Sequence, residues 1–305
     1  MRTDALTKYY GSVAALTGLT MTVPRGEIFG FLGPNGAGKT TAVKLLLGLA
    51  RPTSGHARVL GGPPDDLEMR RRIGYLPELF RYQDWLTARE VLDLHCALAG
   101  VASRQRRSSV DESLELVGLT ARGRDRVGTF SKGMQQRLGL AVALVAEPDV
   151  VFLDEPTSAL DPVGRRDVRE VLRALKSRGS TVFLNSHMLS EVEQVCDRVA
   201  VVDHGRVIAL GTLAELIGGP KRVRIDLDAA SIAFSAAASR FGVLEDGAGT
   251  SIIVGGVEAG SIPDLVAALV ATGARIRSVA PESQTLEDRF LSLLRIPNDA
   301  DPDLR

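Results

Sequence analysis

One glycine-rich segment, Gly33 to Thr40, restricts the possible folds of this chain more than any other feature. It fits the pattern G-x-x-x-x-G-K-[ST], in which glycines let consecutive backbone N–H groups converge on phosphate oxygens. The apolar run Gly26 to Leu32 precedes it and predicts a buried strand, and residues Thr40 to Leu49 follow with helical periodicity. A strand, a glycine loop and a helix in this order predict an α/β domain with a phosphate-binding helix N-terminus.

Two side chains of this loop suit a nucleoside triphosphate. Lys39 can reach the β- and γ-phosphates, and the Thr40 hydroxyl can ligate Mg²⁺. A plain glycine-rich turn is the alternative, and the flanking strand and helix weigh against it. The residues expected to surround the phosphates are Gly33, Pro34, Asn35, Gly36, Ala37, Gly38, Lys39, Thr40 and Thr41.

Strand and helix signals continue to alternate along the chain. Asp149 to Leu153 and Thr181 to Leu184 predict strands that are covered on both faces. Between them, Pro162 to Arg178 predicts an amphipathic helix that Asp161 caps. Helical patterning also predicts an insertion at about residues 81–147. This alternation predicts an α/β domain with a largely parallel sheet.

A second, smaller domain is predicted after the break at Gly218-Gly219-Pro220. From Arg222 onward the patterns follow the order β-α-β-β-α-β, which indicates a small α+β domain of ferredoxin-like type. We therefore expect a nucleotide-binding domain at residues 1–218 and the small domain at 219–296. The acidic residues 297–305 have little to bury and predict a disordered tail.

Two adjacent carboxylates, Asp154 and Glu155, follow the apolar run Val150 to Leu153. A carboxylate at a strand end beside a phosphate loop suits a magnesium ligand, a role that we assign to Asp154. Glu155 would then orient and deprotonate the attacking water. An acidic loop without catalytic function is the alternative, and the upstream phosphate loop weighs against it.

The segment Phe130 to Arg137 (FSKGMQQR) resembles the signature sequence of the ATP-binding-cassette (ABC) family, in the form common in bacterial exporters. As in that family, it lies just upstream of the acidic strand. Ser131 and Gly133 begin an apolar helix, where a hydroxyl and backbone N–H groups can bind an anion. The resemblance implies that they contact the γ-phosphate of ATP held by the other subunit. An ordinary helix cap is the alternative.

Two further elements resemble the same family. Ser158 to Asp161 resembles the loop that crosses the dimer interface, which implies that Asp161 lies close to nucleotide. His187, after the run Val182 to Ser186, resembles the histidine that contacts the γ-phosphate and holds the catalytic geometry. The alternative for a lone histidine after a strand is a capping or surface residue. The resemblance thus implies a catalytic set of Glu155, His187 and Lys39.

Two positions leave a choice of residue. Tyr10 precedes Gly11 and resembles the aromatic residue that stacks on adenine in the family, and its neighbour Tyr9 is the alternative. Glu78 occupies the position where the family normally carries a glutamine that touches Mg²⁺ and senses the membrane partner. A glutamate can still coordinate Mg²⁺, and Gln83 lies close but is shifted along the chain.

The resemblance implies an ATP- and Mg²⁺-dependent hydrolase that works as a homodimer, or as a heterodimer with a second cassette, and drives an integral membrane permease. No apolar run approaches the roughly 20 residues of a membrane-spanning helix, so the permease is expected to be another chain. Without a signal-peptide pattern, a cytoplasmic protein on the inner face of the cell membrane is expected. Formal net charge is zero and the chain has one cassette without a long coiled coil, which argues against a nucleic-acid partner.

Overall fold

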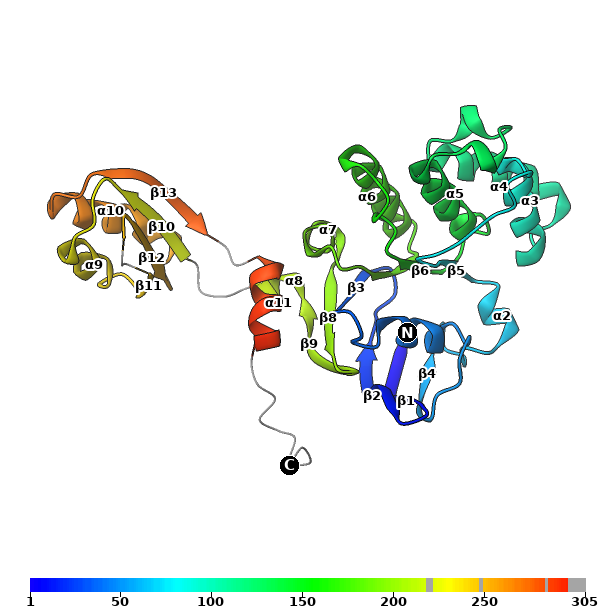
Figure 1. The fold of residues 1–305 in the computed structure, drawn as a ribbon, viewed down its shortest axis with the longest axis horizontal. Helices are drawn as coiled ribbons and strands as arrows, with labels where there is room; N and C mark the ends of the chain where they lie inside the picture. The colour runs from blue at the N-terminus through cyan, green and yellow to red at the C-terminus, as the bar shows by residue number, and fades with distance from the viewer. Residues whose placement is uncertain (218–221, 247–248, 283–284, 296–305) are drawn as a thin grey trace. The chain divides into compact units, whose positions relative to one another are not determined.

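The computed structural model describes residues 1–217, 222–246, 249–282 and 285–295 (Figure 1). The chain divides into two compact units, Met1–Thr212 and Leu213–Arg305, and each has its own hydrophobic core. The expected boundary at residues 218/219 and the expected tail at 297–305 lie outside the described residues and stay predictions.

A six-stranded sheet forms the centre of the first unit, in the order β5-β6-β7-β3-β8-β9. Neighbouring strands from β5 to β8 run parallel, and β9 pairs antiparallel with β8. Strands β3, β6 and β7 are buried along their whole length, as their apolar runs predict. The strands are β3 (Ile28–Leu32), β5 (Ile73–Leu76), β6 (Val150–Asp154), β7 (Thr181–Asn185), β8 (Arg198–Asp203) and β9 (Arg206–Thr212).

Aromatic side chains pack the middle of this sheet. The ring of Phe183 on β7 lies 5.7 Å from Phe29 and 5.2 Å from Phe31, both on β3, measured between centroids. On the other side, Phe152 of β6 lies 5.2 Å from Phe183. Rings at this separation add specific contacts to the burial of apolar area. They fix β6, β7 and β3 side by side, so the loops that follow these three strands meet at one edge of the sheet.

A three-stranded antiparallel sheet, which the sequence patterns did not indicate, occupies the N-terminal part of this unit. It is formed by β1 (Arg2–Tyr10), β2 (Val13–Thr22) and β4 (Ser54–Arg58), in the order β2-β1-β4. Register shifts interrupt the pairing of β1 with both neighbours. Irregularities of this kind break the alternation that identifies a half-buried strand.

Helices complete the first unit, and α3, α4 and α5 lie together within the expected insertion (Figure 1). Helix α3 starts with a capping box, in which the Thr87 hydroxyl and the Glu90 carboxylate each accept a backbone hydrogen bond. Within the described ranges, no helix is long and apolar enough to span a bilayer. The helices are α1 (Lys39–Leu46), α2 (Leu67–Arg70), α3 (Ala88–Ala99), α4 (Ser103–Leu116), η1 (Thr120–Arg122), η2 (Val127–Thr129), α5 (Lys132–Leu144), α6 (Pro162–Ser177) and α7 (Leu189–Val195).

The second unit contains a four-stranded antiparallel sheet in the order β11-β12-β10-β13. One face of β10 contributes Val223, Ile225 and Leu227 to a core that also contains Leu265 and Leu269 of α10. The elements are α8 (Leu213–Ile217), β10 (Arg222–Leu227), α9 (Ile232–Ala238), β11 (Val243–Asp246), β12 (Ser251–Gly255), η3 (Ala259–Ser261), α10 (Ile262–Ala271), β13 (Ile276–Glu282) and α11 (Leu286–Arg295).

Candidate functional site

A cavity of about 530 Å³ lies where the phosphate loop meets the ends of β6 and β7. Among the residues predicted for the site, those that line it are Asn35, Gly36, Gly38, Lys39, Thr40, Thr41, Glu78, Asp154, Glu155 and His187. The predicted residues that are described but are not part of its lining are Gly33, Pro34 and Ala37 of the phosphate loop, and Tyr10, Ser131, Gly133 and Asp161. The structure thus brings together the residues predicted to bind phosphate and metal and to act as the base.

A larger cavity of about 970 Å³ lies elsewhere on the first unit, near Arg25, Glu115 and Asp149. It contains none of the predicted site residues. Volume alone does not identify a site, whereas the smaller cavity has convergent polar groups and a phosphate loop.

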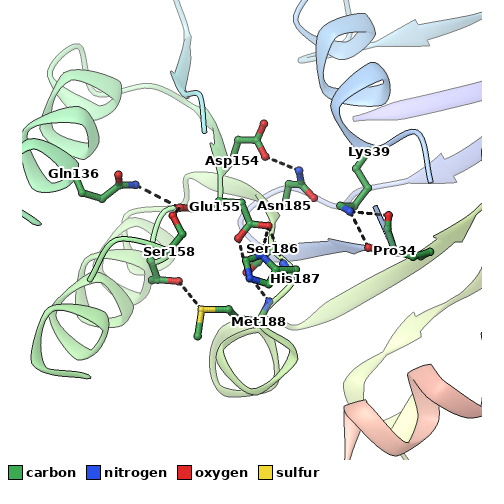
Figure 2. Close-up of polar contacts among 12 residues, drawn as sticks. Pro34, Lys39, Gln136, Asp154, Glu155, Ser158, Asn185, Ser186, His187 and Met188 are labelled. Atoms are coloured by element: carbon green, nitrogen blue, oxygen red, sulfur yellow. Dashed lines mark hydrogen bonds and ion pairs between the residues drawn. The ribbon is translucent and has the colours of Figure 1, made fainter. Parts of the chain in front are cut away.

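Backbone geometry shapes the phosphate loop at the start of α1. Gly38 is the N-cap of this helix with φ of 95°, and a Cβ there would collide with the carbonyl oxygen of Ala15. The Lys39 ammonium donates hydrogen bonds to the carbonyl oxygens of Gly33 (2.7 Å) and Pro34 (3.0 Å), as Figure 2 shows for Pro34. Burial lowers the pKa of Lys39 against the attraction of Glu155, Asp154 and Glu78. This cation therefore lies folded against its own loop, where phosphate oxygens can replace the two carbonyls.

Asp154 lies at the last position of β6, directly beside Asn185 at the last position of β7. Both side chains are buried, and the Asn185 amide nitrogen donates a hydrogen bond of 2.5 Å to Asp154 Oδ1. Burial raises the pKa of Asp154; the Asn185 hydrogen bond opposes that effect, while the nearby charges of Glu78 and Glu155 add to it. Asn185 was not among the predicted site residues, although it ends an apolar run two residues before His187.

Glu155 is held in an unusual backbone conformation by its neighbours. Its φ is 53°, a left-handed value that is uncommon for a residue with a side chain, and its N–H donates to the carbonyl of Asn185 at 2.9 Å. One carboxylate oxygen accepts from the His187 N–H at 2.9 Å and lies 2.8 Å from His187 Nδ1. The Ser186 hydroxyl donates more weakly to the other oxygen, at 3.4 Å. A buried carboxylate and an imidazole are thus joined at the cavity wall (Figure 2).

Comparison with known proteins identifies the family to which a chain with this site belongs. The family model described as ABC transporter matches residues 16–158. An ABC transporter ATP-binding protein of Synechocystis sp. is 40% identical over 285 residues, which cover 93% of this chain and 79% of the relative. This chain belongs to the ABC transporter ATP-binding family. Its first unit is an ABC cassette, and the chain is an ABC-type ATPase.

Further relatives and solved structures agree with this assignment. The bacitracin transport ATP-binding protein BcrA of Bacillus licheniformis is 43% identical over 211 residues, 68% of either chain. A solved ATP-binding subunit of an ABC transporter superposes with a TM-score of 0.66 at 31% identity, covering 70% of this chain and 90% of the other. A dimeric post-hydrolysis structure of the cassette MJ0796, bound to ADP and Pi, gives 0.64 at 26% identity and covers 70% and 98%.

Two residues of the cassette, Ser131 and Asp161, act as helix caps in the structure. The Ser131 hydroxyl accepts the backbone N–H of Met134 at the start of α5. Asp161 accepts the N–H of Gly164 at 2.7 Å at the start of α6, as the sequence predicts. Gly133 lies in the first turn of α5. All three residues therefore lie at helix N-termini, where backbone N–H groups attract anions.

A buried amide of helix α5 supports the loop that follows β6. Gln136 donates from Nε2 to the carbonyl oxygens of Pro156 at 3.1 Å and Glu155 at 3.4 Å. The Ser158 hydroxyl donates to the Glu155 carbonyl at 3.0 Å. The sequence patterns did not reveal these contacts, which connect the signature helix to the loop after β6 (Figure 2).

Tyr10 ends strand β1 with about half of its surface exposed. The ammonium of Lys8 lies 4.9 Å from the centre of its ring. Tyr9 is exposed to a similar degree. Both residues are therefore accessible to a base, and the choice of Tyr10 over Tyr9 stays a prediction.

The donor set around the cavity fits Mg²⁺. No three His, Cys, Asp or Glu side chains form a metal cluster within the residues described. Mg²⁺ in nucleotide sites needs only one or two protein ligands, because phosphate oxygens and waters fill the other positions. Asp154, the Thr40 hydroxyl and Glu78 supply hard oxygen donors to the same cavity. When bound, Mg²⁺ would neutralise charge on the phosphates.

Proposed function

We propose that this chain powers export of a substrate through a separate integral membrane permease, and that two cassettes close head to tail around two ATP molecules. The observation that carries the ATP-hydrolysing step of this proposal is the joined pair of Glu155 and His187, beside Asp154 and Lys39 in one cavity. The dimer is a homodimer or a heterodimer with a second cassette. Two curated relatives are named for bacitracin transport and daunorubicin resistance, which supports an export role.

The residues of one cassette divide the work of hydrolysis. Lys39 exchanges its loop carbonyls for the β- and γ-phosphates, while Thr40 and Asp154 hold Mg²⁺ and Glu78 adds a further oxygen. Glu155 orients the attacking water and accepts its proton. The contacts between His187 and Glu155 hold the carboxylate and the imidazole in place. The imidazole then contacts the γ-phosphate. Positioning and electrostatic stabilisation supply most of the rate enhancement.

The remaining predicted residues complete the site from outside this cavity. Tyr10 stacks on adenine through its exposed ring. Ser131 and Gly133 begin α5 away from the cavity of their own copy, which suits them to the γ-phosphate bound by the opposite copy. Asp161 is the last residue of the loop that crosses between the copies, and it lies close to the nucleotide.

A complementation experiment tests the head-to-tail arrangement. Lys39→Ala removes the ammonium group that would bind the phosphates. Gly133→Asp places a negative charge where the γ-phosphate of the opposite copy would bind. Gly133 tolerates a side chain, because an added Cβ would meet only Leu160 Cδ2 at 3.5 Å. Each variant alone should lack ATP turnover. In a head-to-tail pair, a mixture regains turnover because one site of each mixed dimer has neither substitution; a mixture that stays inactive contradicts the arrangement.

The permease contact is proposed at the Glu78 loop and the helical insertion, on a cassette at the cytoplasmic face of the cell membrane. Leu79, Trp85 and Leu98 are large apolar side chains that are at least 70% exposed there. Charged substitutions at Leu79 and Trp85 should abolish co-purification with the detergent-extracted permease without lowering ATP binding. Ile232→Asp in the second unit is the control, because Ile232 is equally exposed but remote in sequence. Retained co-purification of the charged variants contradicts this docking site.

The second unit is proposed to be a ferredoxin-like domain. From β10 to β13 its strands and helices alternate in the order β-α-β-β-α-β. The first and third of these strands, β10 and β12, occupy the middle of the antiparallel sheet. That arrangement supports the assignment made from sequence.

A further inference from the structure

Asn185 is a buried residue of the site that the division of labour above does not use. Its side chain is 3% exposed, and it pairs in register with Asp154 on the adjacent strand. The amide nitrogen donates to Asp154 Oδ1. The amide oxygen is buried without a hydrogen-bond partner among the described residues. In Figure 2 the amide lies between Asp154 and Lys39, with its nitrogen toward Asp154 and its oxygen on the other side.

The nitrogen and the oxygen of this amide have different roles. The donating end ties one oxygen of Asp154, so that the carboxylate cannot rotate and its other oxygen remains for a cation. The accepting end is an unsatisfied buried group, which is costly until a donor arrives in the cavity. A water held by Mg²⁺ is a strong donor of this kind.

We propose that Asn185 is a positioning residue of the magnesium site, which orients Asp154 through its amide nitrogen and accepts a hydrogen bond from a metal-bound water through its amide oxygen. This inference rests on the proposed placement of Mg²⁺ at Asp154. It predicts that Asn185 controls how strongly Mg²⁺ tightens nucleotide binding, rather than nucleotide binding itself.

Two substitutions of similar size separate this role from simple packing. Asn185→Leu removes both the donor and the acceptor, so Asp154 loses its orientation. Asn185→Asp also loses the donor but keeps an acceptor, and it adds a further carboxylate beside Asp154, so the empty site becomes more repulsive and gains more from a cation. Thr181→Val is the matched control, because Thr181 is equally buried at the opposite end of β7 and its hydroxyl accepts the Gly26 N–H at 3.0 Å.

The measurement is the affinity for a fluorescent mant derivative of AMP-PNP, a non-hydrolysable ATP analogue, in Mg²⁺ and in EDTA. The ratio of the two affinities is the Mg²⁺ enhancement. We expect Asn185→Leu to lower this ratio about tenfold and Asn185→Asp to raise it, while Thr181→Val leaves it unchanged. Titration with Mn²⁺, followed by its electron paramagnetic resonance signal, should give the same order of affinities.

The inference is overturned if either Asn185 variant stays within about twofold of the wild-type ratio, or if both move in the same direction as a packing defect would. Circular dichroism identifies a variant that fails to fold; if Asn185→Leu does so, a rise in the ratio for Asn185→Asp alone supports the inference and its absence overturns it. A wild-type protein without any Mg²⁺ enhancement would instead contradict the proposed metal site.

Discussion

Replacement of Gln136 by leucine should slow ATP hydrolysis while leaving ATP binding intact. The Gln136 amide is buried and donates to the carbonyls of Pro156 and Glu155. Leucine has a similar volume but no donor. The Glu155 carbonyl keeps the Ser158 hydroxyl at 3.0 Å, so the main loss falls on the Pro156 carbonyl.

The magnitude follows from the price of one unsatisfied buried acceptor, about 1–3 kcal/mol. Glu155 is itself in a left-handed conformation that costs about 1–3 kcal/mol and persists only while surrounding contacts enforce it. If the loop relaxes to avoid these costs, the Glu155 carboxylate leaves its place against His187. A displacement that costs about 1.4–2.7 kcal/mol in the transition state lowers kcat roughly 10- to 100-fold.

The assay is steady-state phosphate release with saturating ATP, together with the affinity for mant-AMP-PNP. Gln194→Leu is the matched control, since its amide also donates to a backbone carbonyl, that of Ser190 at 3.1 Å, but on an exposed helix surface. We expect the control to keep wild-type kcat. The reasoning is refuted if Gln136→Leu folds and keeps kcat within about twofold of wild type, a difference of only about 0.4 kcal/mol.

Three further outcomes follow from the structure. Gly38→Ala should lower the melting temperature and weaken nucleotide binding, because a left-handed φ of 95° costs a side chain about 1–2 kcal/mol before the collision of its Cβ; calorimetry and mant-AMP-PNP titration check this. Arg169→Met should destabilise the cassette by about 2 kcal/mol in urea unfolding, because it leaves the buried Glu191 carboxylate without the guanidinium that donates to both its oxygens at 3.0 Å. Hydrogen bonds from the Thr87 N–H and hydroxyl lower the pKa of Glu90, so their stabilisation is present above the ordinary glutamate pKa and is lost as pH falls through the lowered one; Glu90→Ala should therefore destabilise at pH 7 and make little difference near pH 2, by thermal unfolding.

Much of the site could be predicted from sequence because its parts are local. The phosphate loop, Asp154, Glu155 and His187 each follow an apolar strand, and parallel strands bring such loops to one edge of a sheet. Asn185 was missed because its function depends on a neighbour 31 positions away on another strand. Gln136 was missed for the same reason, since an amide within a helix does not indicate which carbonyls it will meet.

The N-terminal sheet illustrates a second limit. Leu6, Leu16 and Leu19 are fully buried and join the core that contains Leu46 of α1, yet Leu16 and Leu19 lie three residues apart on one strand, which is not the strand spacing of two. The register shifts between β1 and its neighbours explain this, because each shift changes which side chains face inward. Sequence patterns predict regular strands well and irregular ones poorly.

Glu155→Gln tests whether Glu155 is the base of an ATP site that two copies share. Glutamine keeps the shape of the side chain but cannot accept the proton from water. Steady-state hydrolysis should fall by at least about 10²-fold, and gel filtration with Mg²⁺ and ATP should show a stable dimer that wild type does not accumulate. A variant that hydrolyses ATP near the wild-type rate would contradict the assignment of the base. A variant that binds ATP and stays monomeric would contradict the shared site.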